Sequence, residues 1–489
     1  MIYVEGREYP FLLNNIERQT LPPLVQEEIG KFLWLRDLAA LGTEEARLLA
    51  RSSIAGWIRQ PLPQDNSVLT AARLCAIIGH FEFYARTADE RFRRRLMRHL
   101  ILVGRLLAIA PPELEGRWQS LVVTRGLMVV AFFLPGFKYL RERALRRLET
   151  TILQQICPDG TVRQRSPDTQ FQVVRELTEM SAILRMAQQP VSDIIMTSLT
   201  RLCPVLRALR HGDGGVSLFH GGWAHDGAFV ERVIQYAGRQ KIVAPTMPDG
   251  RFIRLTGGKA LLLADGGAPP EAGFDQTAHN APFAFEFSYG RQRLLVNCGS
   301  SRLPSWQEAL RHPSAHNSLV TEGLLPPARG GHADASAIER RISTDFVEND
   351  AGLVLELKME VASGAGAYEW ERRLSLSDDG RVLRGAESVK ADADRNLVYR
   401  FHLAPDVRIS DFTEGAFCEL ECDGMIWQFT QQGATLSLEE SVYFGNGFYQ
   451  KTNQIVLTAN DPTERPGELP FDQLGDGRHR VVLWTLERL

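Results

Sequence analysis

The spacing of apolar residues changes once along the chain, and this change constrains the fold more than any other feature. From Leu24 to about Arg210 apolar residues recur at i, i+3 and i+4, as in the run Ala46, Leu49, Ala50, Ile54 and Trp57. From about residue 241 the period becomes two, and every second residue is phenylalanine in the run FAFEF at 283–287. We therefore expect a helical part followed by a β part.

The helical part contains several predicted helices joined by short linkers with Pro or Gly. They are expected near residues 66–87, 90–109, 114–134, 138–155, 169–187 and 191–209. Thr43 before Glu44 and Glu45 predicts a further helix start, because its side-chain oxygen can accept from free backbone N–H groups. Such a row of helices indicates a bundle, a solenoid or a toroid, and the lack of a fixed-period repeat disfavours the regular solenoid.

The β part has many short strands separated by turn signals, which is typical of an antiparallel sandwich. The pairs Asp379-Gly380 and Asp423-Gly424 predict hairpin turns, because glycine accepts a positive φ. A Gly-rich segment, 212–239, joins the two parts and contains His220 and His225. Such a junction can form the wall of a binding cleft or an ordinary interdomain turn.

The length and the charge distribution point to several domains. The chain has 489 residues and a net charge of -3, so we expect two to four domains of globular type. Residues 1–240 hold 31 Lys+Arg and 24 Asp+Glu, hence +7, and the remaining 25 and 35 give -10. Either the first half attracts an anionic ligand or the two halves attract each other.

No export signal or membrane span is expected. The N-terminal residues lack a basic stretch followed by an apolar run, and the longest apolar run, around LMVVAFFLP, is shorter than a bilayer span. The predicted location is the cytoplasm, with the periplasm as the alternative. Six scattered cysteines without a CxxC pair indicate neither a zinc ribbon nor a redox dithiol.

Three polar residues at predicted strand ends form the candidate metal site. His279 and His316 each precede a strand, and Asn297 ends one. Two imidazoles with a neutral amide make a weak zinc site, because zinc usually takes a carboxylate or thiolate as the further ligand. The alternative for each histidine is a hydrogen-bonded structural role.

The basic run at 91–99 does not predict nucleic-acid binding. On a helix its apolar residues share one face and its arginines cover the other, which describes a solvated surface. The chain also lacks GxxxxGK[ST], HExxH and GxSxG.

Several long strings carry a resemblance to a known family. They include ILQQICPDGTVRQRSPD, CPVLRALRHGDGGVSLFHGG, AHNAPFAFEFSYGRQRLLVNCG and LEESVYFG. The chain resembles the heparinase II/III-like polysaccharide lyases, in the branch found in alphaproteobacteria, over nearly its whole length. The resemblance implies an incomplete α/α toroid (1–215), a junction (216–240) and an antiparallel β-sandwich (241–489). It also implies β-elimination on an anionic, uronate-containing polysaccharide.

The catalytic positions of that family are not kept here. The Asn-His pair of the toroid falls on Trp118-Gln119, the Tyr-His pair on Thr169-Gln170, and the catalytic His of the sandwich on Thr277. The Asp of the zinc site falls on Asn297, and only His279 and His316 keep their ligand type. Thr and Gln cannot act as general base or acid near neutral pH.

Other residues must act if the chain is a lyase. Arg165 is the candidate to neutralise the uronate carboxylate, with His220 and Tyr236 as base or acid. Gln119, Gln170, Trp223 and Thr277 are the candidate substrate-binding residues. Three functions stay open: a lyase with a rearranged site, a non-catalytic binder of an anionic glycan or envelope polymer, and an intracellular scaffold. The expected partners are an anionic poly- or oligosaccharide and, in a homodimer, a second copy of the chain.

Overall fold

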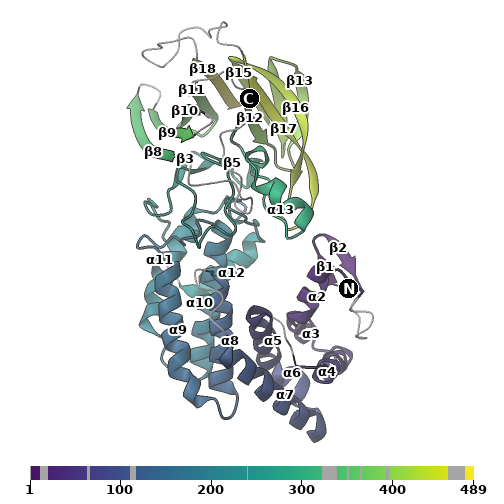
Figure 1. Ribbon diagram of the computed structural model, residues 1–489. Coiled ribbons are helices and arrows are strands. Elements are labelled where there is room, and N and C mark those ends of the chain that lie inside the picture. The colour runs from purple at the N-terminus through teal and green to yellow at the C-terminus, as the bar shows by residue number, and fades with distance from the viewer. Residues whose placement is uncertain are drawn as a thin grey trace. The chain divides into compact units, whose positions relative to one another are not determined.

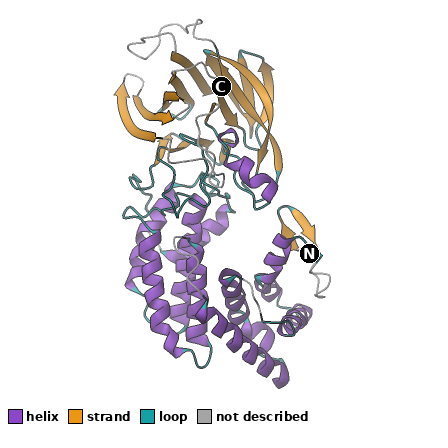
Figure 2. Ribbon diagram, in the orientation of Figure 1, coloured by secondary structure: helices purple, strands orange, loops and turns teal. Residues whose placement is uncertain are grey.

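The computed structural model describes residues 2–10, 20–62, 66–110, 117–238, 241–321, 339–349, 352–363, 366–391, 396–460 and 479–489. Helices dominate the N-terminal part and antiparallel sheets the C-terminal part (Figures 1 and 2), as the change in apolar period predicts. Two compact units are formed. The first comprises Met1–Ile156, Gln172–Thr200 and Tyr236–Arg239, and the second Cys157–Phe171, Arg201–Gln235 and Gln240–Leu489.

The helices of the N-terminal part run largely where the apolar spacing predicts them. They are α2 (Pro23–Gly30), α3 (Trp34–Leu41), α4 (Glu44–Ile58), α5 (Ser67–Gly79), α6 (Phe81–Ala85), α7 (Glu90–Ile109), α8 (Gln119–Phe133), η1 (Lys138–Leu140), α9 (Arg141–Gln155), α10 (Pro167–Met186), α11 (Asp193–Ala208) and α12 (Gly227–Ala237). Within the described part of the chain, none of them combines the length and the apolar character that a bilayer span needs.

Side-chain caps explain where three of these helices begin. Thr43 Oγ1 accepts from the Ala46 N–H at 3.2 Å, which confirms the predicted start of α4. Asn66 Oδ1 accepts from Leu69 N–H at 2.8 Å before α5, and Asp89 Oδ1 from Phe92 N–H at 2.7 Å before α7. Each cap satisfies a backbone donor that has no partner inside its helix.

One predicted helix is divided. The apolar spacing predicted a continuous helix over 66–87, but α5 ends at Gly79 and α6 begins at Phe81. His80 between them has φ -108° and ψ 17°, outside the helical region. The prediction was wrong here because the apolar positions of the two helices stay nearly in phase across the break.

Helix α8 is mostly buried and packs closely on α5. A Cβ atom added to Gly126 would lie 2.6 Å from the Cβ of Ala71 and 2.9 Å from its Cα, so only glycine fits at this contact. The close approach lets the two helix backbones pack with little side-chain volume between them.

Within the residues that the structure describes, the strands form four antiparallel sheets. Their orders are β1-β2, then β13-β14-β15-β18-β11-β10-β9-β8, then β16-β17-β12-β7, and β3-β4-β5-β6. The bounds are β1 (Ile2–Val4), β2 (Arg7–Tyr9), β3 (Phe252–Gly257), β4 (Ala260–Asp265), β5 (Phe285–Tyr289), β6 (Gln292–Leu295), β7 (Leu319–Thr321), β8 (Glu339–Asn349), β9 (Gly352–Ser363), β10 (Gly366–Leu376), β11 (Val382–Ala391), β12 (Leu397–His402), β13 (Arg408–Thr413), β14 (Phe417–Cys422), β15 (Met425–Gln432), β16 (Ala434–Tyr443), β17 (Gln450–Ala459) and β18 (His479–Arg488). Short helical segments α13 (Pro304–Arg311) and η2 (Pro313–Ala315) precede β7.

Both predicted Asp-Gly turns are confirmed. Asp379-Gly380 joins β10 to β11, and Asp423-Gly424 joins β14 to β15. Asp423 has φ 51° and Gly424 φ 72°, the paired positive values of a tight hairpin turn.

The core of the second unit is shared by three sheets. Phe285 of β5 stacks on Trp484 of β18 with ring centres 5.7 Å apart, and Phe401 of β12 lies 5.0 Å from the same indole. The fully buried Arg372 donates from Nε to Glu387 Oε1 at 2.8 Å and from Nη1 to the carbonyls of Phe283 and Asn317. The sheets are thus held together by aromatic packing and by the hydrogen bonds from Arg372 to the Phe283 and Asn317 carbonyls.

Candidate functional site

The candidate site lies within the second compact unit and is built mainly from residues at strand ends and in loops. Asp265 is the last residue of β4, Asn297 follows β6, and His316 follows η2. Arg165 precedes α10, and His220 belongs to the Gly-rich segment before α12. These positions come from five separate stretches of sequence.

Two of these residues have an unusual backbone. Arg165 has φ 51° and His220 has φ 50°, in the left-handed region that side chains other than glycine seldom adopt. Such conformations cost energy and persist only where the surrounding contacts hold them. Here the contacts that hold them converge on Asp265.

Asp265 is the centre of a buried charge cluster. Arg165 Nη2 donates to Asp265 Oδ1, and His220 Nε2 lies 2.7 Å from Asp265 Oδ2. The Gly267 N–H also donates to Oδ1, at 3.0 Å. The two remaining Arg165 donor groups go to backbone carbonyls, Nε to Gly250 at 2.9 Å and Nη1 to Ala268. All the nitrogens of the Arg165 guanidinium therefore have partners inside the protein.

The cluster keeps Asp265 ionised. Burial alone would raise the pKa of this carboxyl, but the charges of Arg165 and His220 outweigh burial and hold the pKa below its ordinary value. The side chains of Arg165 and Asp265 are only 8% and 4% exposed, so solvent contributes little to this balance.

The candidate metal ligands are adjacent, as predicted from their places at strand ends. His279 Nδ1 lies 3.0 Å from His316 Nε2, and His316 Nδ1 lies 3.2 Å from Asn297 Oδ1. The His279 backbone N–H donates to His220 Nδ1 at 3.2 Å, which links this trio to the Asp265 cluster. Burial lowers the pKa of His316 to about 3 and that of His279 well below its usual value, so both rings are neutral at pH 7.

A second buried carboxylate, Glu286, fixes Asn297. Glu286 Oε1 accepts from the Asn297 side-chain amide and from its backbone N–H, both at 3.1 Å. Glu286 Oε2 lies 2.9 Å from His211 Nε2. Burial would raise the pKa of Glu286, but its contacts with His211 and Arg293 lower it instead. Asn297 is thereby a bridge between His316 and a buried anion.

This donor set does not fit a zinc ion. The facing nitrogens of His279 and His316 are directed at each other, and Asn297 Oδ1 also accepts from the Asn317 N–H at 3.2 Å. Across the residues that the structure describes, no group of three or more His, Cys, Asp or Glu side chains is arranged to hold a metal. A neutral amide in place of the usual carboxylate leaves the site without an anionic ligand.

The other predicted residues have separate environments. Gln170 accepts from Val162 N–H at 2.9 Å and donates to the carbonyls of Gly160 and Leu202. Trp223 is partly buried and donates from Nε1 to the Ser300 carbonyl at 2.7 Å, with the Arg302 guanidinium 5.6 Å from its ring centre. Thr277 is partly buried beside Gly221, where an added Cβ would lie 2.8 Å from the Thr277 carbonyl.

Two predicted residues belong to the first compact unit. Gln119 begins α8 and is partly buried, and Tyr236 lies on α12 with 76% of its surface exposed. The predicted residues that hydrogen bonds bring together are thus Arg165, His220, His279, His316 and Asn297.

Sequence reasoning missed both carboxylates. Asp265 ends the apolar run ALLLAD and precedes Gly266-Gly267. An acidic residue at the end of such an apolar strand could have identified it as a candidate site residue. Glu286 stands between Phe285 and Phe287, and a charged residue in such an alternating pattern is typical of a strand face open to solvent. In fact it is fully buried, because both faces of β5 are covered.

Comparison with known proteins gives three kinds of match. The family model described as heparinase II/III-like, C-terminal, matches residues 239–473. FtsZ-localized protein C of Caulobacter vibrioides is 26% identical over 462 aligned residues, covering 88% of this chain and 78% of that protein.

The solved structures that resemble the chain include lyases. A heparinase III has a TM-score of 0.69 at 12% identity, covering 96% of this chain and 79% of its own. A mutant of the heparan sulfate lyase HepC from Pedobacter heparinus has a TM-score of 0.61 at 12% identity, covering 96% and 78%. At such identities the likeness concerns the fold alone.

Proposed function

Because residues 239–473 form a heparinase II/III-like C-terminal domain and the chain has the heparinase III fold, we propose that it is a non-catalytic relative of the polysaccharide lyases. In this proposal it binds an anionic, uronate-containing glycan or cell-envelope polymer without cleaving it. The observation that carries the proposal is the pairing of Asp265 with both Arg165 and His220.

The chemistry of β-elimination explains why this contact matters. The proton beside a uronate carboxylate becomes removable only when a cation or donor stabilises the enolate-like intermediate, and a base must reach that proton. Each guanidinium nitrogen of Arg165 already has a partner, and both ring nitrogens of His220 are engaged, Nε2 with Asp265 and Nδ1 with the His279 N–H. Recruiting either group would break buried contacts at a cost of several kcal/mol.

Aromatic side chains support the binding part of the proposal. Trp223 is partly buried and lies beneath the Arg302 guanidinium. Trp306 and the half-exposed Tyr449 form a ring pair 5.9 Å apart, with Tyr449 51% exposed. Flat apolar rings beside a cation suit a ligand that combines sugar rings with carboxylates.

The test combines a binding and a product measurement. The full chain is titrated calorimetrically with a panel of uronate polymers, heparan sulfate among them, and the same mixtures are followed by ultraviolet absorbance for the unsaturated uronate. We expect binding without product, and Trp223→Ala should weaken binding, while Tyr139→Ala, at an exposed aromatic residue outside the candidate site, serves as the control. Product formation that Arg165→Ala or His220→Ala abolishes would overturn the proposal in favour of a lyase.

A second candidate is an intracellular scaffold that associates with FtsZ. It is favoured by one observation, the similarity to a protein whose name places it with FtsZ. A cytoplasmic location would accompany this role, with the periplasm as the alternative for a glycan binder. Co-sedimentation of the purified chain with FtsZ polymers tests it, and an unchanged supernatant concentration would count against the scaffold.

The architecture that we propose with this function follows the solved lyases. Residues 1–215 would form an incomplete α/α toroid and residues 241–489 an antiparallel β-sandwich, with 216–240 as the junction. Support comes from the row of helices α2 to α11 and from the core that three antiparallel sheets share. Small-angle scattering of the full chain, compared with the curve of a heparinase III, tests this arrangement.

A further inference from the structure

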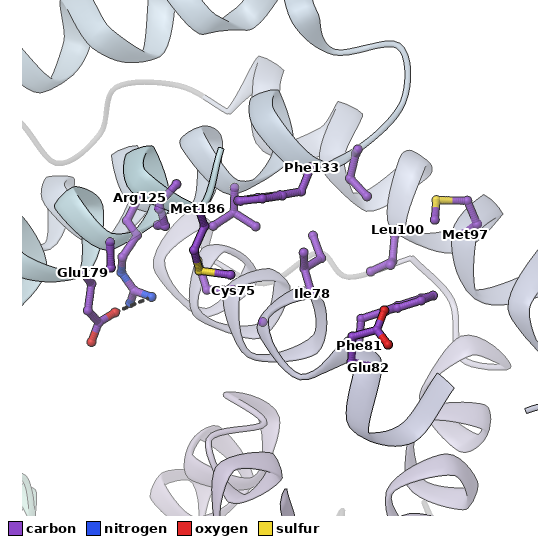
Figure 3. Close-up of a pocket in the computed structure, with 15 residues that line it drawn as sticks. Cys75, Ile78, Phe81, Glu82, Met97, Leu100, Arg125, Phe133, Glu179 and Met186 are labelled. Carbon is purple, nitrogen blue, oxygen red and sulfur yellow. Dashed lines mark ion pairs between the residues drawn. The ribbon is translucent and has the colours of Figure 1, made fainter. Parts of the chain in front are cut away.

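A cavity in the first compact unit lies outside the candidate site described above. It has a volume of about 500 Å³ and is bordered by α5, α6, α7, α8 and α10. This volume falls within the range of small-molecule sites in proteins. None of its lining residues is a predicted site residue, and Figure 3 shows their arrangement.

Most of the cavity wall is apolar. The apolar side chains include Ile78, Leu100, Val129, Phe133, Ile183 and Met186. Met186 is 70% exposed and Phe133 37% exposed, so an apolar surface is open to solvent at the cavity. Cys75 contributes a neutral thiol, because burial raises its pKa to about 11. Such a wall can bury the apolar part of a flexible ligand.

The charged residues that line the cavity are one cation, Arg125, and two carboxylates, Glu82 and Glu179. Arg125 donates from Nε to Glu176 Oε2 at 2.7 Å, and its Nη1 lies 2.9 Å from Glu179 Oε2. Glu176 is fully buried, whereas 44% of the Glu179 side chain is exposed. Figure 3 shows Glu179 with Arg125 at one end of the apolar stretch and Glu82 toward the other.

The sign of the charge selects the ligand. Arg125 already has two carboxylate partners, so an anionic ligand would have to displace Glu179 to reach it. A cation can approach the exposed part of Glu179 while its ion pair with Arg125 stays in place, and the exposed Glu82 adds a second negative charge to the wall. Carboxylates at the edge of an apolar cavity favour a ligand with an apolar body and a positive charge.

We propose that this cavity binds a small amphipathic cation, with the apolar body between the helices and an ammonium or guanidinium group at Glu179. The site is independent of the proposed glycan binding, since none of its lining residues is a candidate glycan-binding residue and the aromatic residues Trp223, Trp306 and Tyr449 belong to the second compact unit. The two proposals can therefore fail separately.

The experiment compares three probes that share one apolar chain. Octylammonium, octanol and octanoate are titrated calorimetrically into the full chain below their aggregation concentrations. We expect saturable binding in the order octylammonium, octanol, octanoate. Tighter binding of octanoate than of octylammonium would overturn the proposal, as would a lack of saturation with all three probes.

Two variants locate the binding. Glu179→Gln should weaken octylammonium about fivefold, the size expected for a partly exposed ion pair, and leave octanol unchanged. Ala182→Trp should fill the cavity and abolish the binding of every probe. Glu142→Gln on α9, an exposed carboxylate away from the lining, is the matched control.

The folded state of each variant is checked by its thermal midpoint. Octylammonium affinity that is unchanged in a folded Ala182→Trp would place the probe elsewhere and end the proposal. If that variant does not fold, Ile183→Phe provides the same test with a smaller added volume.

Discussion

Asp265 accepts from Arg165 and Gly267 and pairs with His220 in a region where almost no side-chain surface is exposed. The carboxylate holds both partners in place. In the proposed non-catalytic role, this one acidic group is what keeps Arg165 and His220 from acting on a substrate.

Replacing that group should destabilise the protein. Asp265→Asn leaves the buried guanidinium of Arg165 without its counter-charge, and breaking a buried pair in this way typically costs about 3–5 kcal/mol. Urea unfolding of the variant and the parent measures the difference. Asp378→Asn, an exposed aspartate in a turn, is the control and should change the stability by less than about 0.5 kcal/mol. An equally small change in Asp265→Asn would contradict the reading of the cluster.

The same carboxylate predicts a pH dependence. The pKa of Asp265 is depressed in the folded state, so its stabilising contribution is present above the ordinary carboxyl pKa of about 4 and is lost as pH falls through the lower, folded value. The acid limb of the stability curve should therefore be shallower in Asp265→Asn than in the parent. Thermal midpoints measured from neutral to acid pH give the slopes, and parallel acid limbs would exclude Asp265 as the cause.

Replacing Asn297 by aspartate should increase the affinity of the site for zinc. In Asn297→Asp the new carboxylate would face Glu286, whose Oε1 now accepts from the amide at 3.1 Å, so the variant should be less stable. A carboxylate beside two imidazoles is also the donor set that zinc prefers. We expect zinc to raise the thermal midpoint of the variant, whereas the parent should purify with less than one zinc per chain. Equal zinc content in both proteins, measured by mass spectrometry, would show that Asn297 does not decide the metal affinity.

At the scale of elements, the apolar spacing predicted a helix more accurately where a capping side chain in the sequence shows where the helix begins. The predicted limits of α7, Glu90 and Ile109, are those observed, because Asp89 caps its start. The division between α5 and α6 was missed, since the apolar positions carry no mark of the break at His80. The strand-end trio His279, Asn297 and His316 was predicted from strand limits alone. Its carboxylate partners were not, because a sequence does not show which strand will cover a given face.

Two glycines predict stability changes of opposite sign. A Cβ atom on Gly385 of β11 would lie 2.0 Å from the Trp484 ring, so Gly385→Ala should cost about 1–3 kcal/mol through displacement of the indole. Gly56 in α4 has no atom within 4 Å of its added Cβ, so Gly56→Ala should stabilise by about 0.5–1 kcal/mol. Denaturant midpoints of both variants test the pair. Stabilisation by Gly385→Ala would show that the sheet yields more easily than this packing indicates.

At the scale of the whole molecule, positive charge is carried almost entirely by arginine. The chain has 49 Arg and 7 Lys, and residues 1–240 hold the net excess of cations, 31 against 24 acidic residues. If a polyanion binds through this charge, the contacts are mainly guanidinium contacts, which hold carboxylates in bidentate geometry.

Chemical modification tests this expectation. Acetylation of lysines should change the affinity for a uronate polymer by less than about twofold, since so few lysines contribute, whereas added salt should weaken binding strongly. Calorimetry before and after acetylation measures the effect, with mass spectrometry to count the modified sites. A large loss of affinity on acetylation would assign the binding to the few lysines instead.

Gly126 has a consequence beyond the contact that it makes. It brings α8 against Ala71 of α5, and the two helices also supply Cys75, Ile78, Arg125 and Val129 to the cavity wall. The width of that cavity thus depends on the absence of a side chain at Gly126, a residue that does not line the cavity. Gly126→Ala would separate α5 from α8 and so change the size of ligand that fits, although every lining residue stays the same. Two proteins with identical lining residues can therefore differ in ligand selectivity.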